Sequence, residues 1–161
     1  MPEKLFSLAE SEGILVDFFP LPADILGVYY HVGDKPPVIL LHSKLKNERR
    51  LQRCILAEEL GHHFTTGANL IAFARSQKTI LYKYEKIAQL WAVKLLIPAN
   101  KLKEALNSGI VSTHELAEHF DVTERFMGTG IQFYKEKYVE CLEKDRESSG
   151  GYPNDCNQEE F

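Results

Sequence analysis

The first third of the chain carries short apolar runs separated by turn residues, and it predicts one helix followed by strands. Residues 5–12 predict a short helix, and residues 14–19 predict an edge strand or an extended lead-in. Two β-rich runs, 26–32 and 37–41, flank a Gly-Asp-Lys-Pro turn, and such a pair favours a β-hairpin. We therefore expect a small sheet of about three strands.

The remaining residues show mostly helical spacing. In the segment Arg50–Phe64, apolar residues recur near every third or fourth position, which indicates a helix with Asn47 as its candidate cap. Further helices are predicted at residues 80–97, 100–108, 113–120 and 124–144. Ser112 or Thr113 would cap the third of these, whereas residues 69–79 predict no clear element. The whole pattern predicts an α+β fold, a small sheet packed by helices with a helical C-terminal part.

Composition fits one globular domain with an acidic tail. The chain has 161 residues, of which 44% are hydrophobic and 26% are charged, ordinary proportions for a globular domain. Residues 140–161 hold seven acidic and two basic residues, a net charge of −5, so the rest of the chain is near neutral at +1. We expect a single domain over residues 1–146 and a mobile acidic tail over residues 147–161.

Several classes of protein do not fit these features. No apolar run is long enough to span a bilayer, and the first residues lack the charged-then-apolar layout of a secretory signal. Cys54, Cys141 and Cys156 have no metal-binding or redox spacing, and no strongly cationic face for DNA is evident. We therefore expect a cytoplasmic protein that does not enter a membrane and does not bind nucleic acid directly.

The most informative chemistry lies in the helix of residues 50–64. Its segment Glu58-Glu59-Leu60-Gly61-His62 has the register of the H-E-x-x-H pattern, in which two metal ligands at i and i+4 accompany a glutamate general base. Residues four apart lie on one helical face, so Glu58 and His62 can hold one ion while Glu59 points at a neighbouring angle. Zinc accepts carboxylate oxygen as well as imidazole nitrogen. The five residues alone would also fit a solvated helix face, but an apolar stripe borders them.

A third ligand has to come from another element. Ala57 and Gly61 are small and lie four apart, which allows another element to approach the metal helix closely. The best candidate ligand is Glu85, in the first turn of the next strong helix, where a carboxylate also suits the helix dipole. Gln89 follows one turn later, where it could hydrogen-bond Glu85 or a bound water.

The order of these features resembles the ImmA/IrrE family of metallopeptidases. The matching pieces are the strand-like run 38–41, the basic run 48–50, the helix segment 57–62 and the stretch 85–98, and the likeness spans roughly residues 10–135. It implies a gluzincin-like protein with a zincin-like metal helix, in which Glu58, His62 and Glu85 bind the metal and Glu59 is the general base. Glu58 stands where the common family pattern has histidine. Two carboxylates and one imidazole form a more anionic ligand set than two imidazoles and one carboxylate. This shifts the metal preference modestly toward harder ions such as Mn²⁺, but Zn²⁺ remains the first expectation.

The resemblance also implies an activity and a partner. The first hypothesis is a metal-dependent endopeptidase that cleaves a protein, because such proteins often cut a helix-turn-helix transcriptional repressor encoded beside them on a mobile element or prophage. The alternative is a catalytically weak or inactive relative that binds a regulator without cutting it. The substitution at Glu58 keeps this alternative open.

The other histidines receive weaker assignments. His63 points about 100° away from His62 around the helix, and His42 follows a strand, so each could at most contact substrate or support the site. His114 and His119 flank a segment that looks like a zinc motif, but histidines five apart do not share a helical face. Residues 116–133 resemble half of a helix-turn-helix without a basic second helix, so DNA reading is not expected.

Overall fold

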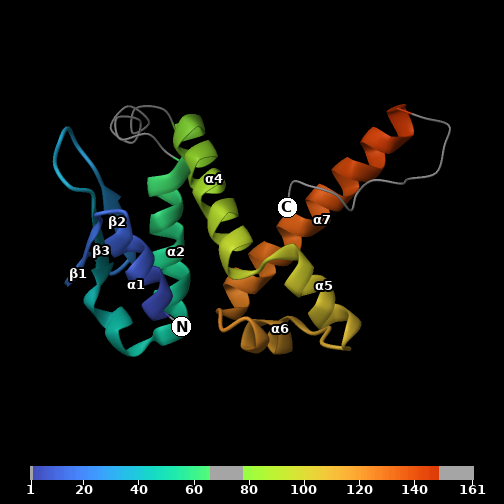
Figure 1. Ribbon diagram of the computed structural model, residues 1–161, viewed down its shortest axis with the longest axis horizontal. Coiled ribbons are helices and arrows are strands. Elements are labelled where there is room, and N and C mark those ends of the chain that lie inside the picture. The colour runs from blue at the N-terminus through green and yellow to red at the C-terminus, as the bar shows by residue number, and fades with distance from the viewer. Residues whose placement is uncertain (1, 66–77, 149–161) are drawn as a thin grey trace.

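The computed structural model describes residues 2–65 and 78–148, and Figure 1 shows a small sheet with helices beside it. In chain order the elements are α1 (Pro2–Ser11), β1 (Leu15–Phe19), β2 (Gly27–Tyr30), β3 (Val38–His42), the 3-10 helix η1 (Ser43–Asn47), α2 (Arg49–Thr65), α4 (Lys78–Leu96), α5 (Ala99–Asn107), α6 (Thr113–His119) and α7 (Glu124–Ser148). These elements form the α+β fold that the sequence predicts.

The sheet has β3 at its centre, in the strand order β1-β3-β2. β3 runs parallel to β1, with Leu15 opposite Val38, and antiparallel to β2, with Tyr29 opposite Ile39. Because side chains alternate along a strand, Ile39 and Leu41 share one face, and both are fully buried. They belong to the core that the sheet forms with α1 and α2. The predicted hairpin is confirmed, and residues 15–19 form an edge strand.

The helix α2 lies between the sheet and α4 (Figure 1). Leu56, Ala57 and Leu60 are fully buried on it, and burying a leucine side chain contributes roughly 1.5–3 kcal/mol. A side chain at Gly61 would collide with the backbone carbonyl of Ala88 on α4. The backbones of α2 and α4 therefore touch at Gly61, as the small residues predicted. The contact between Gly61 and Ala88 therefore sets how closely α2 and α4 approach each other at this level.

Both ends of α6 are closed by hydrogen bonds, and its C-terminal end directs the chain into α7. Ser112 opens α6 with a capping box, in which its Oγ accepts a hydrogen bond from the Glu115 N–H at 3.2 Å and the Glu115 carboxylate accepts from the Ser112 N–H at 3.4 Å. At the other end of α6, Asp121 has a φ of 53°, in the left-handed region. Its N–H and that of the next residue return to carbonyls of α6, which is the Schellman arrangement. The chain thus leaves α6 sharply and enters α7 three residues later.

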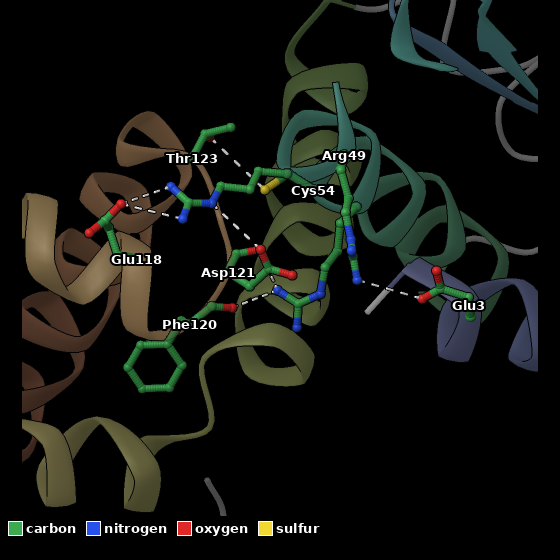
Figure 2. Close-up of polar contacts among 9 residues, drawn as sticks. Glu3, Arg49, Cys54, Glu118, Phe120, Asp121 and Thr123 are labelled. Atoms are coloured by element: carbon green, nitrogen blue, oxygen red, sulfur yellow. Dashed lines mark hydrogen bonds and ion pairs between the residues drawn. The ribbon is translucent and has the colours of Figure 1, made fainter. Parts of the chain in front are cut away.

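Arginines of α2 hold the α6–α7 turn. Figure 2 shows Glu118, Phe120 and Asp121 of this turn facing the side chains of α2. Arg53 donates to the carbonyl of Phe120 at 2.7 Å and to that of Asp121 at 2.8 Å. Arg50 pairs with Glu118 at 3.4 Å and with Asp121 at 3.5 Å. Burial lowers the pKa of Arg53, against the opposing charge of Asp121. These contacts join the first half of α2 to the start of α7.

The predicted helices and strands agree with the structure to within a few residues, but two details differ. Asn47 does not cap α2, because it ends η1, and the carbonyl of Glu48 accepts the first helical hydrogen bond, from Gln52 at 2.8 Å. The helix α7 runs to Ser148, two residues into the predicted tail. The rest of that tail, and most of the unassigned segment 69–79, lie outside the described residues.

Candidate metal centre

A cavity of about 510 Å³ lies among α2, α4 and α7. Glu58, Glu59 and His62 line it from α2, and Glu85 and Gln89 line it from α4. The other lining residues are Tyr82, Lys86 and Leu90 of α4 and Gly128, Thr129, Gln132, Phe133 and Glu136 of α7. All residues that the sequence analysis assigned as ligands or base therefore face one cavity.

His62 and Glu85 make a direct contact between α2 and α4. Nε2 of His62 lies 3.3 Å from Oε2 of Glu85. Two ligands of a tetrahedral zinc site are also about 3.3 Å apart, because each lies about 2.0–2.1 Å from the ion. Burial acts to lower the pKa of His62, but the hydrogen bond to Glu85 and nearby carboxylates raise it above its ordinary value. The same hydrogen bond lowers the pKa of Glu85.

Glu58 lies in the same cavity but is hydrogen-bonded to another group. Burial raises the pKa of its carboxyl, and the side chain of Gln89 donates a hydrogen bond to it. Across residues 2–65 and 78–148, no three His, Cys, Asp or Glu side chains stand together as a ready metal-binding group. The structure thus brings His62 and Glu85 together as a pair, with Glu58 in the same cavity. Gln89 supports Glu58 rather than Glu85.

Glu59 is supported by the strand β2. Burial raises the pKa of its carboxyl to about 7, while the charge of His62 and a hydrogen bond from the Tyr29 backbone N–H act in the opposite direction. Gly27 on the same strand leaves room for this side chain, because a Cβ there would lie 2.6 Å from Oε1 of Glu59. Sequence reasoning singled out Glu59 as the candidate base but missed the contacts that Tyr29 and Gly27 make with it, since both residues lie far away along the chain.

The polar groups of the cavity fit a divalent cation. The carboxylates of Glu58, Glu59 and Glu85 line the same cavity as the imidazole of His62. Glu58 and Glu59 are largely buried, whereas Glu85 is exposed, and buried carboxylates need a compensating positive charge. The charge of Arg125 on α7 lowers the pKa of Glu58 but is opposed by burial. Nδ1 of His62 is buried without a hydrogen-bond partner among the described residues. Nitrogen and oxygen donors of this kind suit zinc, and an oxygen-rich set also suits manganese.

His63 and His42 have partners of their own away from this cavity. Nδ1 of His63 lies 3.1 Å from the hydroxyl of Tyr29, and its Nε2 lies 3.9 Å from the carboxylate of Glu12. Nδ1 of His42 accepts a hydrogen bond from the Lys44 N–H at 3.1 Å and so caps η1. Neither histidine lines the cavity, so a substrate-contacting role for them gains no support from their positions. Gln89, the third supporting residue considered, does line it.

The histidines of α6 have separate environments. Nδ1 of His114 lies 2.8 Å from the carboxylate of Glu124. His119 instead packs edge-on against Phe120. The zinc-like look of this segment is therefore coincidental, as the five-residue spacing predicts.

The wall formed by α7 is the part of the cavity that sequence reasoning missed. Lys86 on α4 pairs with Glu136 on α7 at 3.5 Å, and Gln132 donates a hydrogen bond to Glu136 at 2.9 Å. Polar residues four apart within residues 124–144 were the only indication in the sequence. That pattern is also typical of any solvated helix face, so it could not have identified the wall.

Comparison with known families connects this geometry to a described class of protein. The sequence model of a peptidase family, the IrrE N-terminal-like domain, matches residues 9–131 of the chain. The matched segment includes the sheet, α2, α4 and the first part of α7, and hence Glu58, Glu59, His62 and Glu85. A search of curated proteins gives no match to the chain. None of the helices within the described residues is long and apolar enough to cross a membrane.

Proposed function

Because the chain belongs to the IrrE N-terminal-like domain family of metallopeptidases, we propose that it is a metal-dependent endopeptidase whose ion is held by Glu58, His62 and Glu85. The observation that carries this proposal is the 3.3 Å contact between His62 and Glu85 in a cavity that also contains Glu58 and Glu59. Zn²⁺ is the expected ion, and Mn²⁺ is the second candidate because two of the three ligands are carboxylates.

The protein's own groups supply proton transfer and orientation. When bound, a divalent ion polarises the scissile carbonyl and lowers the pKa of water. Glu59, fixed by the Tyr29 N–H and by the space at Gly27, is placed to take a proton from the attacking water and return it to the leaving amine. Gln89 orients the Glu58 carboxylate through its hydrogen bond. Cleavage of the peptide bond thus needs one carboxylate that moves a proton and three ligands that hold the ion.

The proposed substrate is a helix-turn-helix transcriptional repressor encoded beside this chain on a mobile element or prophage. Membership of the peptidase family supports a protein substrate. The repressor is the more specific part of the hypothesis, and purified repressor is the natural test substrate.

The substitution Glu59→Gln tests the mechanism. Glutamine keeps the shape of the side chain but cannot accept the proton, so metal content by elemental analysis should be unchanged while repressor cleavage on gels falls by about 100-fold or more. Glu104→Gln is the matched control, because Glu104 pairs with Lys101 on the exposed surface of α5. Retained cleavage by Glu59→Gln would reject the assignment of the base.

A second function, binding without cleavage, is favoured by one observation. Glu58 stands where the common pattern has histidine, and among the described residues it does not form a ready three-residue metal-binding group with His62 and Glu85. A binder would form a stable complex with the repressor on size-exclusion chromatography without producing fragments. An endopeptidase would convert one repressor band into two.

A further inference from the structure

One face of α7 lines the candidate active site, and part of that face lies beyond the matched family segment. Gly128, Gln132 and Glu136 are spaced four residues apart, and all three line the cavity. Residues at this spacing form a row along one side of a helix, here about 12 Å long. The family match ends at residue 131, so Gln132 and Glu136 lie outside it. Part of the cavity wall is therefore set by residues that the family model does not cover.

Two glycines of α7 have different surroundings. A Cβ at Gly130 would lie 2.8 Å from Cδ1 of Ile97 and 3.5 Å from Cγ1 of Val93, so close packing against α4 and the residue after it explains this glycine. A Cβ at Gly128 would meet nothing within 4 Å. Glycine is unfavourable inside a helix, and no packing contact with the described residues compensates for it at Gly128. Gly128 is exposed and lines the cavity, so the open space beside it, which we call the recess, is a solvent-accessible part of the cavity.

The lining of the cavity is mostly polar, and Leu90 and Phe133 add an apolar part that an apolar side chain of a peptide can contact. Lys86 and Glu136, which are both about half exposed, form an ion pair at 3.5 Å, and Gln132 donates to Glu136 at 2.9 Å. A row of about 12 Å matches three to four residues of an extended peptide, each of which advances about 3.3 Å. The α7 face thus has the length and the mixed surface that suit a peptide.

We propose that this face of α7 selects the substrate: an apolar side chain of an extended peptide enters the recess at Gly128, and the peptide continues along Gln132 and Glu136. This inference rests on the proposed peptidase function and adds a substrate preference to it. The missing side chain at Gly128 keeps the recess open in the same cavity as His62 and Glu85.

Synthetic fluorogenic octapeptides, varied at one position at a time, test the recess. Gly128→Leu fills it, and Lys135→Ala is the control because Lys135 is exposed on α7 and does not line the cavity. We expect Gly128→Leu to lower kcat/KM by about tenfold or more for peptides with a large apolar side chain at one position. Peptides with glycine or alanine there should lose much less. An equal loss for all peptides, or no loss, overturns the proposal.

Thermal unfolding of a smaller substitution checks that the recess is open. Because a Cβ at Gly128 meets nothing, Gly128→Ala should unfold at the same temperature as the wild type or higher. Gly130→Ala, two residues away, should unfold at a lower temperature because of its contact with Ile97. A lower midpoint for Gly128→Ala would show that the space is filled and would overturn the proposal.

Peptide binding separates this inference from the peptidase function. The same peptides, labelled with a single fluorophore, are titrated against Glu59→Gln by anisotropy, with and without Gly128→Leu. Gly128→Leu should raise Kd about tenfold for the large apolar peptides only. If the wild type cuts no peptide but this selective loss of binding is seen, the peptidase proposal fails and the substrate-selecting face stands. If binding does not depend on Gly128, or no peptide binds, the α7 proposal fails.

Discussion

Gly61→Ala tests whether the contact between α2 and α4 holds the candidate metal ligands in place. The new Cβ would overlap the Ala88 carbonyl oxygen and lie 2.9 Å from the Ala88 carbonyl carbon. These are backbone atoms of a helix, so they cannot rotate away, and the two helices must separate. Overpacking costs about 1–3 kcal/mol, and an overlap with backbone belongs at the upper end. Alanine recovers about 1 kcal/mol through its better helix propensity, so we expect a net loss of about 2 kcal/mol.

The loss should appear in both stability and metal binding. For a chain of this length, about 2 kcal/mol corresponds to a fall of roughly 4–8 °C in the unfolding midpoint measured by circular dichroism. Because Gly61 adjoins His62 and Ala88 lies between Glu85 and Gln89 in sequence, zinc affinity by competition with a chelating dye should also fall. Gly128→Ala is the matched control, and its stability should rise by up to about 1 kcal/mol. If the Gly61→Ala protein had wild-type stability and zinc affinity, the contact between Gly61 and Ala88 would not be what sets the distance between the candidate ligands on α2 and α4.

Two further substitutions test the supports of the site. Gly27→Ala should displace Glu59, because the new Cβ would lie 2.6 Å from its Oε1; we expect unchanged metal content by elemental analysis and roughly 100-fold slower repressor cleavage, and normal cleavage would argue against the role of β2. Arg53→Met removes two hydrogen bonds from a charged donor to the carbonyls of the α6–α7 turn. Since hydrogen bonds to charged groups contribute about 1.5–3 kcal/mol each, the free energy of unfolding in a urea titration should fall by about 3 kcal/mol, and an unchanged value would mean that the turn is not anchored there.

The ligand candidates could be predicted because they depend on local patterns. The i, i+4 spacing of Glu58 and His62 needs only a helix, and the apolar stripe of α2 predicts one. Ala57 and Gly61 indicated a close partner, and the structure places α4 and the Ala88 carbonyl there. The meeting of His62 with Glu85 follows from this approach.

The rest of the site could not be predicted because it depends on how distant elements pack. Gly27 reads as an ordinary glycine in a strand, and only the folded chain shows that it faces Glu59. The hydrogen bond from Gln89 to Glu58 crosses between two helices, whereas the sequence suggested Glu85 or a bound water as the partner of Gln89. Nothing in the local sequence around Gly128 indicates that it lines the cavity, because its position depends on where the α6–α7 turn directs α7.

The contact between Gly61 and Ala88 has a consequence for how this protein can diversify. The separation of α2 and α4 at this level is set by main-chain atoms of α4 and by the absence of a side chain on α2. Exchanges at nearby cavity residues such as Leu90 and Tyr82 therefore leave that separation intact. The lining of the cavity can therefore change at such positions while the contact between His62 and Glu85 is kept. Gly61 itself has no room for a side chain, because a Cβ there would collide with the backbone of Ala88.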